Sequence, residues 1–339
     1  MWIALRTLAI GAVGALLAFL AGIPAPFLTG PAFLVTLSAL LGLKAAIHPR
    51  YRDAIFVVIG VNMGTSVTPE AVATAAKWPG SLAMLSLSIL VIFLGGAGIL
   101  KSVSGMDRMS ALLTATPGHL SFVLSLSSDV KADIGRVTMI QTMRVLSLTL
   151  IVPFLAPLLS ETPLVGMRLA GDPMTLPSLA ALFLMAVLVG LAVQKLRLPA
   201  ALLLGGMAVS SVAHGFGITE GTMPPWLSMP AFVSMGALIG TRFTGVSPRM
   251  VLSSLGASAM LTGFAAAVSL LGALMVSRLL GLPILNVLIA FAPGGLETMM
   301  AMSILLNANP AYVAAHHVFR LIFLSIVLPV VVARNRERA

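Results

Sequence analysis

Two arginines, Arg144 and Arg320, lie within strongly apolar segments, and each follows a polar side chain three residues earlier, Gln141 and His317. Residues three apart share one face of a helix, so each pair predicts a polar stripe. An arginine in the hydrocarbon region of a membrane costs about 2.5–3.5 kcal/mol on insertion scales, and it usually faces a cavity or a partner. These four residues are therefore candidates for binding an anionic or polar solute. The alternative is that each arginine only tethers carbonyl groups of a broken helix.

A proline-glycine break precedes each arginine at the same distance. The first break contains Pro117, Gly118 and His119, and the second contains Pro293, Gly294 and Gly295. Proline and glycine end one helix and allow another to begin. A helix that begins there points free N–H groups and its positive dipole end toward the break, which favours anions. The alternative is that the breaks are tight turns or close helix contacts.

Glu297 is the one carboxylate that we expect inside the hydrocarbon region. It lies two residues after Gly295, and Ser121 stands at the corresponding place in the first half. As a functional group, Glu297 could bind a proton or sodium ion that drives transport. As a structural group, it would pair with Arg144 or Arg320 or cap the second half of the broken helix.

The composition places all these residues in a membrane protein. Of 339 residues, 59% are hydrophobic and 9% are charged, and the mean hydropathy is +1.08, whereas a soluble domain has about 25% charged residues. The formal net charge is +10, but the basic residues stand singly in short loops, which indicates topology signals and argues against nucleic-acid binding. Cysteine is absent, so no disulfide or thiolate-bound metal is expected.

The chain is an internal duplication. The segment from Pro117 to Pro153 aligns without a gap with that from Pro293 to Pro329, and the alignment keeps the prolines, a glycine and the central arginine. Similarity between two unrelated apolar stretches would preserve leucines instead. We therefore predict a membrane repeat at residues 1–159, a more polar linker at 160–177 and a second membrane repeat at 178–339.

Each half offers six apolar segments: 3–22, 26–43, 53–67, 80–100, 109–127 and 135–157, then 178–193, 198–214, 228–241, 251–277, 283–305 and 311–333. If the fifth segment dips into the membrane and returns, most flanking basic residues fall on one side, and the exceptions are Lys77, Arg168 and Arg278. The sequence thus predicts an all-α polytopic membrane protein of two inverted repeats, each with about five crossings and a broken or re-entrant helix. Both termini are expected to be cytoplasmic.

The breaks resemble the AbrB family of duplicated bacterial membrane proteins, whose repeats carry a segment similar to Ala-Thr-Pro-Gly-Gly-(Leu/Met)-Ser-Glu-Met followed by a helix with a central arginine. The second copy reads Ala292-Pro293-Gly294-Gly295-Leu296-Glu297-Thr298-Met299, and the first reads Ala115-Thr116-Pro117-Gly118-His119-Leu120-Ser121-Phe122. His119 replaces the second glycine, and the first copy lacks the acidic residue. The resemblance implies a bacterial inner-membrane protein with repeated domains. Members are labelled ammonia monooxygenases or regulators of gene expression.

Two inverted halves with matching helix breaks predict a site at the repeat interface, as in secondary carriers. We expect a transporter-like carrier for a small anionic or polar solute, with H⁺ or Na⁺ coupling and homo-oligomerisation as open options. The alternative is a membrane sensor that influences gene expression without transport. No enzyme activity and no cofactor are expected, because an oxygenase metal needs several converging ligands and only His119 and His317 of the five histidines could meet.

Overall fold

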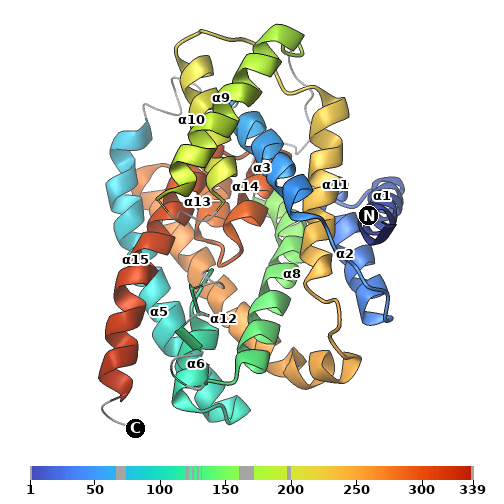
Figure 1. Ribbon diagram of the computed structural model, residues 1–339. Helices are drawn as coiled ribbons and strands as arrows, with labels where there is room; N and C mark the ends of the chain where they lie inside the picture. Colours follow the sequence, from blue (N-terminus) through green and yellow to red (C-terminus); the bar gives the residue numbers. More distant parts are fainter. Residues whose placement is uncertain are drawn as a thin grey trace. The chain divides into compact units, whose positions relative to one another are not determined.

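The computed structural model describes residues 2–65, 74–118, 122–123, 126–127, 130, 132–159, 172–196 and 200–336. These residues form helices joined by short connections (Figure 1). An isolated β-bridge pairs Pro173 with Thr222. The described helices of the first half are α1 (Trp2–Leu20), α2 (Pro26–Leu40), α3 (Pro49–Gly64), η1 (Thr74–Lys77), α5 (Trp78–Ser104), α6 (Arg108–Ala115) and α8 (Ile134–Leu159). Those of the second half are α9 (Leu176–Gln194), α10 (Ala201–Gly215), α11 (Pro225–Thr241), α12 (Pro248–Leu280), α13 (Ile284–Phe291), α14 (Leu296–Leu305) and α15 (Pro310–Arg336).

Six of the described helices are long and apolar enough to cross a membrane: α1, α5 and α8 in the first half, and α9, α12 and α15 in the second. The chain is therefore an all-α polytopic membrane protein, as predicted. Helices α2 and α10 have 15 residues each and rise about 22 Å, less than the roughly 30 Å of hydrocarbon. Helices of this length do not by themselves establish a membrane crossing. The number of about five crossings per half therefore stays a prediction.

The duplication is visible in the backbone. Ala25 and Ala200, 175 positions apart, precede α2 and α10 and have φ angles of 50° and 52°. This left-handed region is unfavourable for a residue with a Cβ atom. The same exception at matching places supports a common origin of the two halves.

The described helices cluster into two compact units, and each unit combines segments of both sequence halves. Unit 1 comprises Met1–Ala75, Thr149–Gly245 and Glu297–Val313, and unit 2 comprises Ala76–Leu148, Val246–Leu296 and Ala314–Ala339. These compact units cut across the repeats predicted at 1–159 and 178–339, whose limits in the sequence remain predictions.

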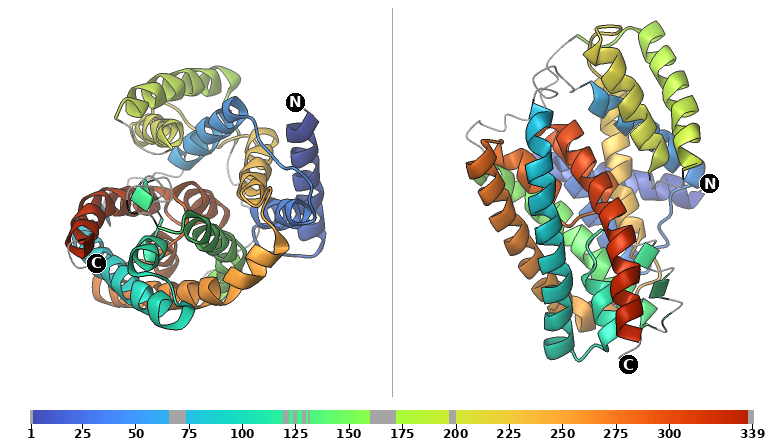
Figure 2. Two further views of the ribbon diagram at one scale, coloured as in Figure 1. Left: turned by 60° about the horizontal axis from the view of Figure 1, so that its bottom comes forward. Right: turned by 90° about the vertical axis from the view of Figure 1, so that its left-hand side faces the viewer.

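Unit 1 is held together by reciprocal packing between the halves. A Cβ atom on Gly60 of α3 would overlap the backbone carbonyl of Leu203 in α10, and one on Gly236 of α11 would overlap that of Leu28 in α2. Gly236 and Leu28 are the repeat counterparts of Gly60 and Leu203. The left view of Figure 2 shows the two resulting groups, α1 with α2 and α11, and α9 with α10 and α3. Small residues allow these close approaches.

Unit 2 shows that the repeats are inverted. Helices α5 and α12 are repeat counterparts, and Gly80, Gly95 and Gly96 of α5 pack successively on Leu280, Phe264 and Leu261 of α12. The rising numbers on one helix meet falling numbers on the other, so the two helices run antiparallel. Equivalent helices of opposite direction are what an inverted duplication requires.

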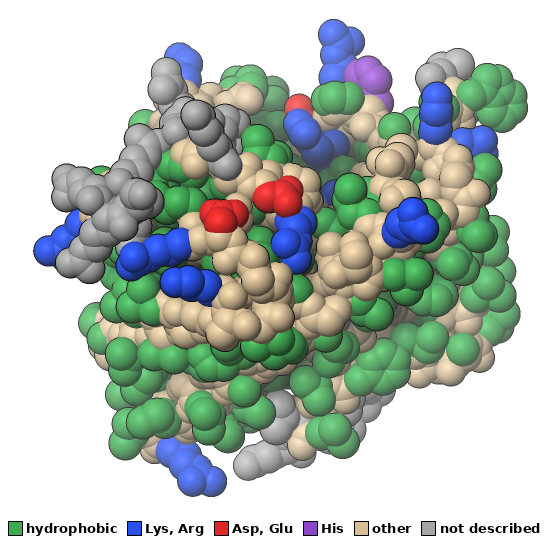
Figure 3. Space-filling view, turned by 90° about the horizontal axis from the view of Figure 1, so that it is seen from below, with side chains coloured by type: hydrophobic (Ala, Val, Ile, Leu, Met, Phe, Trp, Pro, Cys, Tyr) green, Lys and Arg blue, Asp and Glu red, His purple; other side chains and the backbone are tan. Residues whose placement is uncertain are grey.

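The two ends of unit 2 differ in the number of described Lys and Arg residues that they carry. Lys77, at the start of α5, lies beside Gly281, at the end of α12 and three residues after Arg278. At the other end, Arg136 donates a 3.3 Å hydrogen bond to the carbonyl of Ser104 at the end of α5. That end also carries basic residues near the start of α6 and of α12 and at the end of α15: Arg108, Arg249 and Arg334. Figure 3 shows Lys and Arg side chains, together with Asp or Glu side chains, on the face seen from below, where apolar side chains also lie.

Candidate functional site

The fifth segment of the second half is broken, as predicted. Helix α13 ends at Phe291, and α14 begins at Leu296. A helix end leaves backbone carbonyls without partners in the helix. Arg320 of α15 donates to two carbonyls of the break: Nη1 donates to the carbonyl of Ala292, the C-cap of α13, at 2.8 Å, and Nη2 donates to the Gly294 carbonyl at 2.9 Å.

His317 completes this set of bonds. Its Nε2 lies 3.1 Å from the Ile289 carbonyl, and its Nδ1 lies 2.7 Å from Nη2 of Arg320. A carbonyl only accepts and a guanidinium only donates. The bonds therefore fix the tautomer with the proton on Nε2 and a lone pair on Nδ1 facing Arg320. The polar stripe predicted for this helix exists, but its two side chains contact each other and the broken backbone.

The first half repeats the arrangement with fewer bonds. Gln141 of α8 donates through Nε2 to the Leu113 carbonyl at 2.8 Å, and Arg144 donates through Nη2 to the Thr116 carbonyl at 3.0 Å. Leu113 and Thr116 lie 176 positions before Ile289 and Ala292. The two arginines thus hold corresponding carbonyls at the ends of α6 and α13, where the negative end of the helix dipole favours a cation.

Both arginines are enclosed, with 1% of the surface of each exposed. A Cβ atom on Gly118 would lie 2.8 Å from Nη2 of Arg320, so the first break lies against the arginine of the second half. Arg144, Arg320 and both breaks up to Leu296 therefore meet within unit 2.

Hydrogen-bond donors remain at this place. Within the residues that the structure describes, Nε and Nη1 of Arg144 and Nε of Arg320 are buried without a hydrogen-bond partner. The arginines bond carbonyls of the broken helices, as in the alternative in which each arginine is only a tether. Their remaining N–H groups could donate to another acceptor.

The remaining predicted residues lie as follows. Pro117, Pro293 and Gly294 are buried, and Gly118 and Gly295 are partly exposed. Gly118 has a φ of +83°, a conformation that glycine allows. His119 and Ser121 lie outside the described residues.

Glu297 lies in the first turn of α14 and is partly exposed. Among the described residues the ion pair found is that of Arg52 with Asp53, so the pairing of Glu297 with either arginine stays a prediction. Its position in the first helical turn suits a carboxylate, because the helix dipole is positive there.

Three features of this region were not predicted. Ser269 of α12 donates to the Phe291 carbonyl at 2.9 Å. His316 bonds the Ser81 hydroxyl at 2.9 Å and packs against the rings of Trp78 and Phe291. Serines on apolar helices show no periodic pattern in the sequence. The spacing of residues therefore could not reveal the partners of these side chains.

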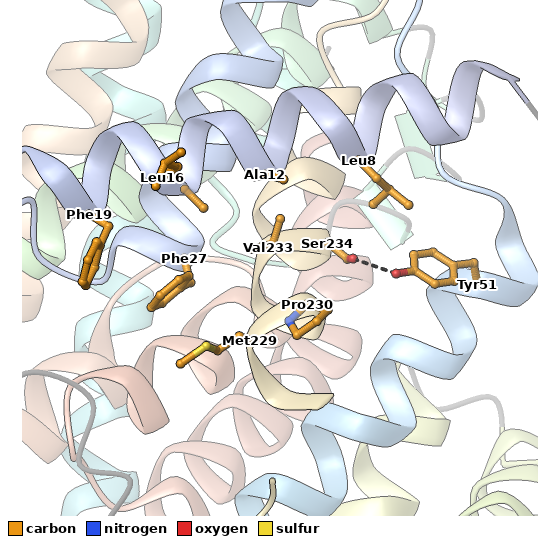
Figure 4. A pocket seen from close by; sticks show the side chains of 11 residues that line it. Leu8, Ala12, Leu16, Phe19, Phe27, Tyr51, Met229, Pro230, Val233 and Ser234 are labelled. Atoms are coloured by element: carbon orange, nitrogen blue, oxygen red, sulfur yellow. Dashed lines mark hydrogen bonds between the residues drawn. The ribbon is translucent and has the colours of Figure 1, made fainter. Parts of the chain in front are cut away.

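An apolar hollow of about 550 Å³ lies in unit 1 (Figure 4). Tyr51 and Ser234 supply its hydroxyl groups, and their oxygens are 3.1 Å apart and bonded to each other. The other lining side chains are apolar: Leu8, Ala12, Ala15, Leu16, Phe19, Phe27, Met229, Pro230 and Val233. This hollow offers no charged group to an anion.

No group of three His, Cys, Asp or Glu residues that could hold a metal ion is found among the described residues.

Comparison with known proteins gives two bacterial relatives. The chain is 29% identical over 294 residues to "Uncharacterized protein YhjN" of Bacillus subtilis (strain 168), which covers 80% of this chain and 75% of the relative. It is 24% identical over 320 residues to "Putative regulator AbrB" of Escherichia coli (strain K12), which covers 91% of this chain and 89% of the relative. A family model described as "Transition state regulatory protein AbrB" matches residues 27–335, a range that includes both breaks and both buried arginines. The chain belongs to the AbrB family.

Proposed function

We propose that the protein is a membrane carrier for a small anionic or polar solute and that the paired helix breaks form its binding site. The observation that carries the proposal is the pair of buried arginines at repeat-related breaks within unit 2. Irregular backbone at membrane depth is tolerated where it lines a cavity or is buried in protein, and in carriers it forms the substrate site.

Charge supports an anionic solute. The described acidic residues of unit 2 are Asp107 and Asp133, and both are exposed. They stand just before α6 and α8 and accept hydrogen bonds from backbone N–H groups in the first turns of these helices. The two buried arginines therefore have no carboxylate partner among the described residues of this unit. An anion that enters the site would supply the missing countercharge. Glu297 is the candidate group for a coupling proton or sodium ion.

The proposal places the protein in a bacterial inner membrane, with both termini cytoplasmic and no catalytic step. A second candidate function is a membrane sensor that binds the solute without moving it. The names of the family and of the Escherichia coli relative refer to regulation and favour this alternative. Both functions use the same site, so transport itself must be measured.

The experiment has two stages. The unfolding temperature of the purified protein is measured against inorganic anions, carboxylates, amino acids, ammonium and sodium, because a ligand of the folded state raises stability by mass action. Each stabilising solute is then offered in radiolabelled form to liposomes that contain the protein. We expect saturable uptake above that of empty liposomes. Stabilisation without uptake contradicts the carrier and supports the sensor, and a panel with neither contradicts both.

A further inference from the structure

The two repeat-related arginines differ in how many of their N–H groups are used. Arg320 makes three hydrogen bonds, to the Ala292 and Gly294 carbonyls and to His317. Arg144 makes one among the described residues, to the Thr116 carbonyl. Nε and Nη1 of Arg144 have no partner there, and these two nitrogens carry three of the five N–H bonds of a guanidinium.

The sequence difference between the halves explains this asymmetry. His317 offers Arg320 the lone pair of Nδ1, whereas Gln141 stands in its place in the first half and bonds Leu113. Gly294 offers its carbonyl to Arg320. Its counterpart Gly118 has a φ of +83°, a left-handed conformation that Gly294 does not share. The first break therefore differs from the second in backbone conformation at this glycine, and among the described residues Nε and Nη1 of its arginine have no hydrogen-bond partner.

We infer that Arg144 is the anion-binding group of this site and that it binds one small oxyanion, whereas Arg320 is a structural tether. This inference rests on the proposed function and specifies its ligand. A guanidinium has donors and no acceptor, and its N–H groups match carboxylate and other oxyanion oxygens. The side chain is buried and directed to the break by its bond to Thr116, so a bound oxyanion would meet both the free N–H groups and an uncompensated charge.

A matched pair of conservative variants tests the assignment. Arg144→Lys and Arg320→Lys each keep the charge and remove the planar set of N–H donors. Unfolding temperature is followed while sodium acetate, sodium lactate, sodium nitrate and sodium phosphate are titrated at constant ionic strength, with chloride as the reference. Acetate and lactate report a carboxylate ligand, and nitrate and phosphate report an inorganic one.

We expect at least one oxyanion to stabilise the wild type with saturation. In Arg144→Lys the concentration for half-maximal stabilisation should rise about tenfold or more, or the effect should vanish. Arg320→Lys should unfold at a lower temperature and yet keep that concentration within about twofold. The inference is overturned if Arg144→Lys keeps the wild-type response, or if Arg320→Lys alone loses it.

A second variant covers the case in which Arg144→Lys does not fold. Gln141→Glu places a carboxylate one turn from Arg144 on the same helix face, and it should abolish the oxyanion response by competition. An unchanged response in Gln141→Glu overturns the inference. It is also overturned if Glu297→Gln and Arg144→Lys destabilise the protein equally and their effects do not add, because Glu297 is then the partner of Arg144.

These outcomes separate the inference from the proposed function. If a solute is taken up by liposomes and Arg144→Lys leaves its half-saturating concentration unchanged, the carrier stands and the assignment of Arg144 fails. If an oxyanion binds through Arg144 and no uptake occurs, the assignment stands and the carrier fails.

Discussion

His317 contributes two hydrogen bonds at the second helix break. It bonds the Ile289 carbonyl on one side and Arg320 on the other, and it is fully buried. Gln141 at the corresponding position holds only the equivalent carbonyl. His317 therefore gives its arginine a hydrogen-bond partner that Gln141, among the described residues, does not give to Arg144.

His317→Ala should lower the free energy of unfolding by about 1–3 kcal/mol, because the Ile289 carbonyl and one N–H of Arg320 lose their partners in a buried place. His317→Gln is the matched control, since glutamine already makes the equivalent bond in the first half, and its loss should be clearly smaller. Denaturant unfolding of the purified protein in detergent measures both. Equal losses for the two variants would show that the bond to Ile289 contributes nothing.

At the level of elements, glycines set the distances between helices. Gly60 lets α3 approach the Leu203 carbonyl of α10, and Gly236 lets α11 approach the Leu28 carbonyl of α2. The neighbour in each case is backbone, which cannot rotate away as a side chain can. These crossings hold the two halves together inside unit 1.

Gly60→Ala and Gly236→Ala should each destabilise the protein by about 1–3 kcal/mol, because an added methyl group forces packed helices apart. Gly256→Ala in α12 is the control, since a methyl group there meets nothing within 4 Å. This control should be neutral or stabilising by up to about 1 kcal/mol, owing to the higher helix propensity of alanine. Thermal unfolding of the three variants side by side measures the difference, and loss of stability in Gly256→Ala alone would contradict the packing argument.

At the scale of the whole molecule, the antiparallel packing of α5 and α12 is the observation that bears on membrane topology. Lys77 and Arg278 were predicted on the side opposite to most other basic residues, and the structure places Lys77 beside the last turn of α12, where Arg278 lies. The unequal number of described Lys and Arg residues at the two ends of unit 2 agrees with the positive-inside rule, which counts basic residues.

The absence of cysteine makes this topology testable with single cysteines in the native chain. Ala76 and Ser102 are exposed, stand near opposite ends of α5 and carry no charge. In intact cells, a membrane-impermeant maleimide should label Ala76→Cys and should label Ser102→Cys only after the membrane is permeabilised. The reverse pattern would contradict the predicted orientation, with cytoplasmic termini.

Much of the fold was predictable because apolar segments have the length of membrane helices. The segment predicted at 135–157 is α8, Ile134–Leu159, and the break at Pro293 and Gly294 separates α13 from α14. The segment predicted at 53–67 missed the start of α3 at Pro49. Its first turn is polar, so hydropathy does not reveal it, although proline at the first helical position is a known start signal.

The sequence alone determined the membrane class, the duplication, the paired breaks and the helix face that joins Gln141 to Arg144 and His317 to Arg320, because helix spacing and apolar length act locally. The tertiary structure decided how α3 pairs with α10 and which carbonyls the arginines hold. It also decided that, among the described residues, Arg144 makes one hydrogen bond and Arg320 makes three. Spacing fixes the direction of a side chain on its own helix, but its partner depends on a backbone some 28 residues away in the chain, and only packing brings the two together.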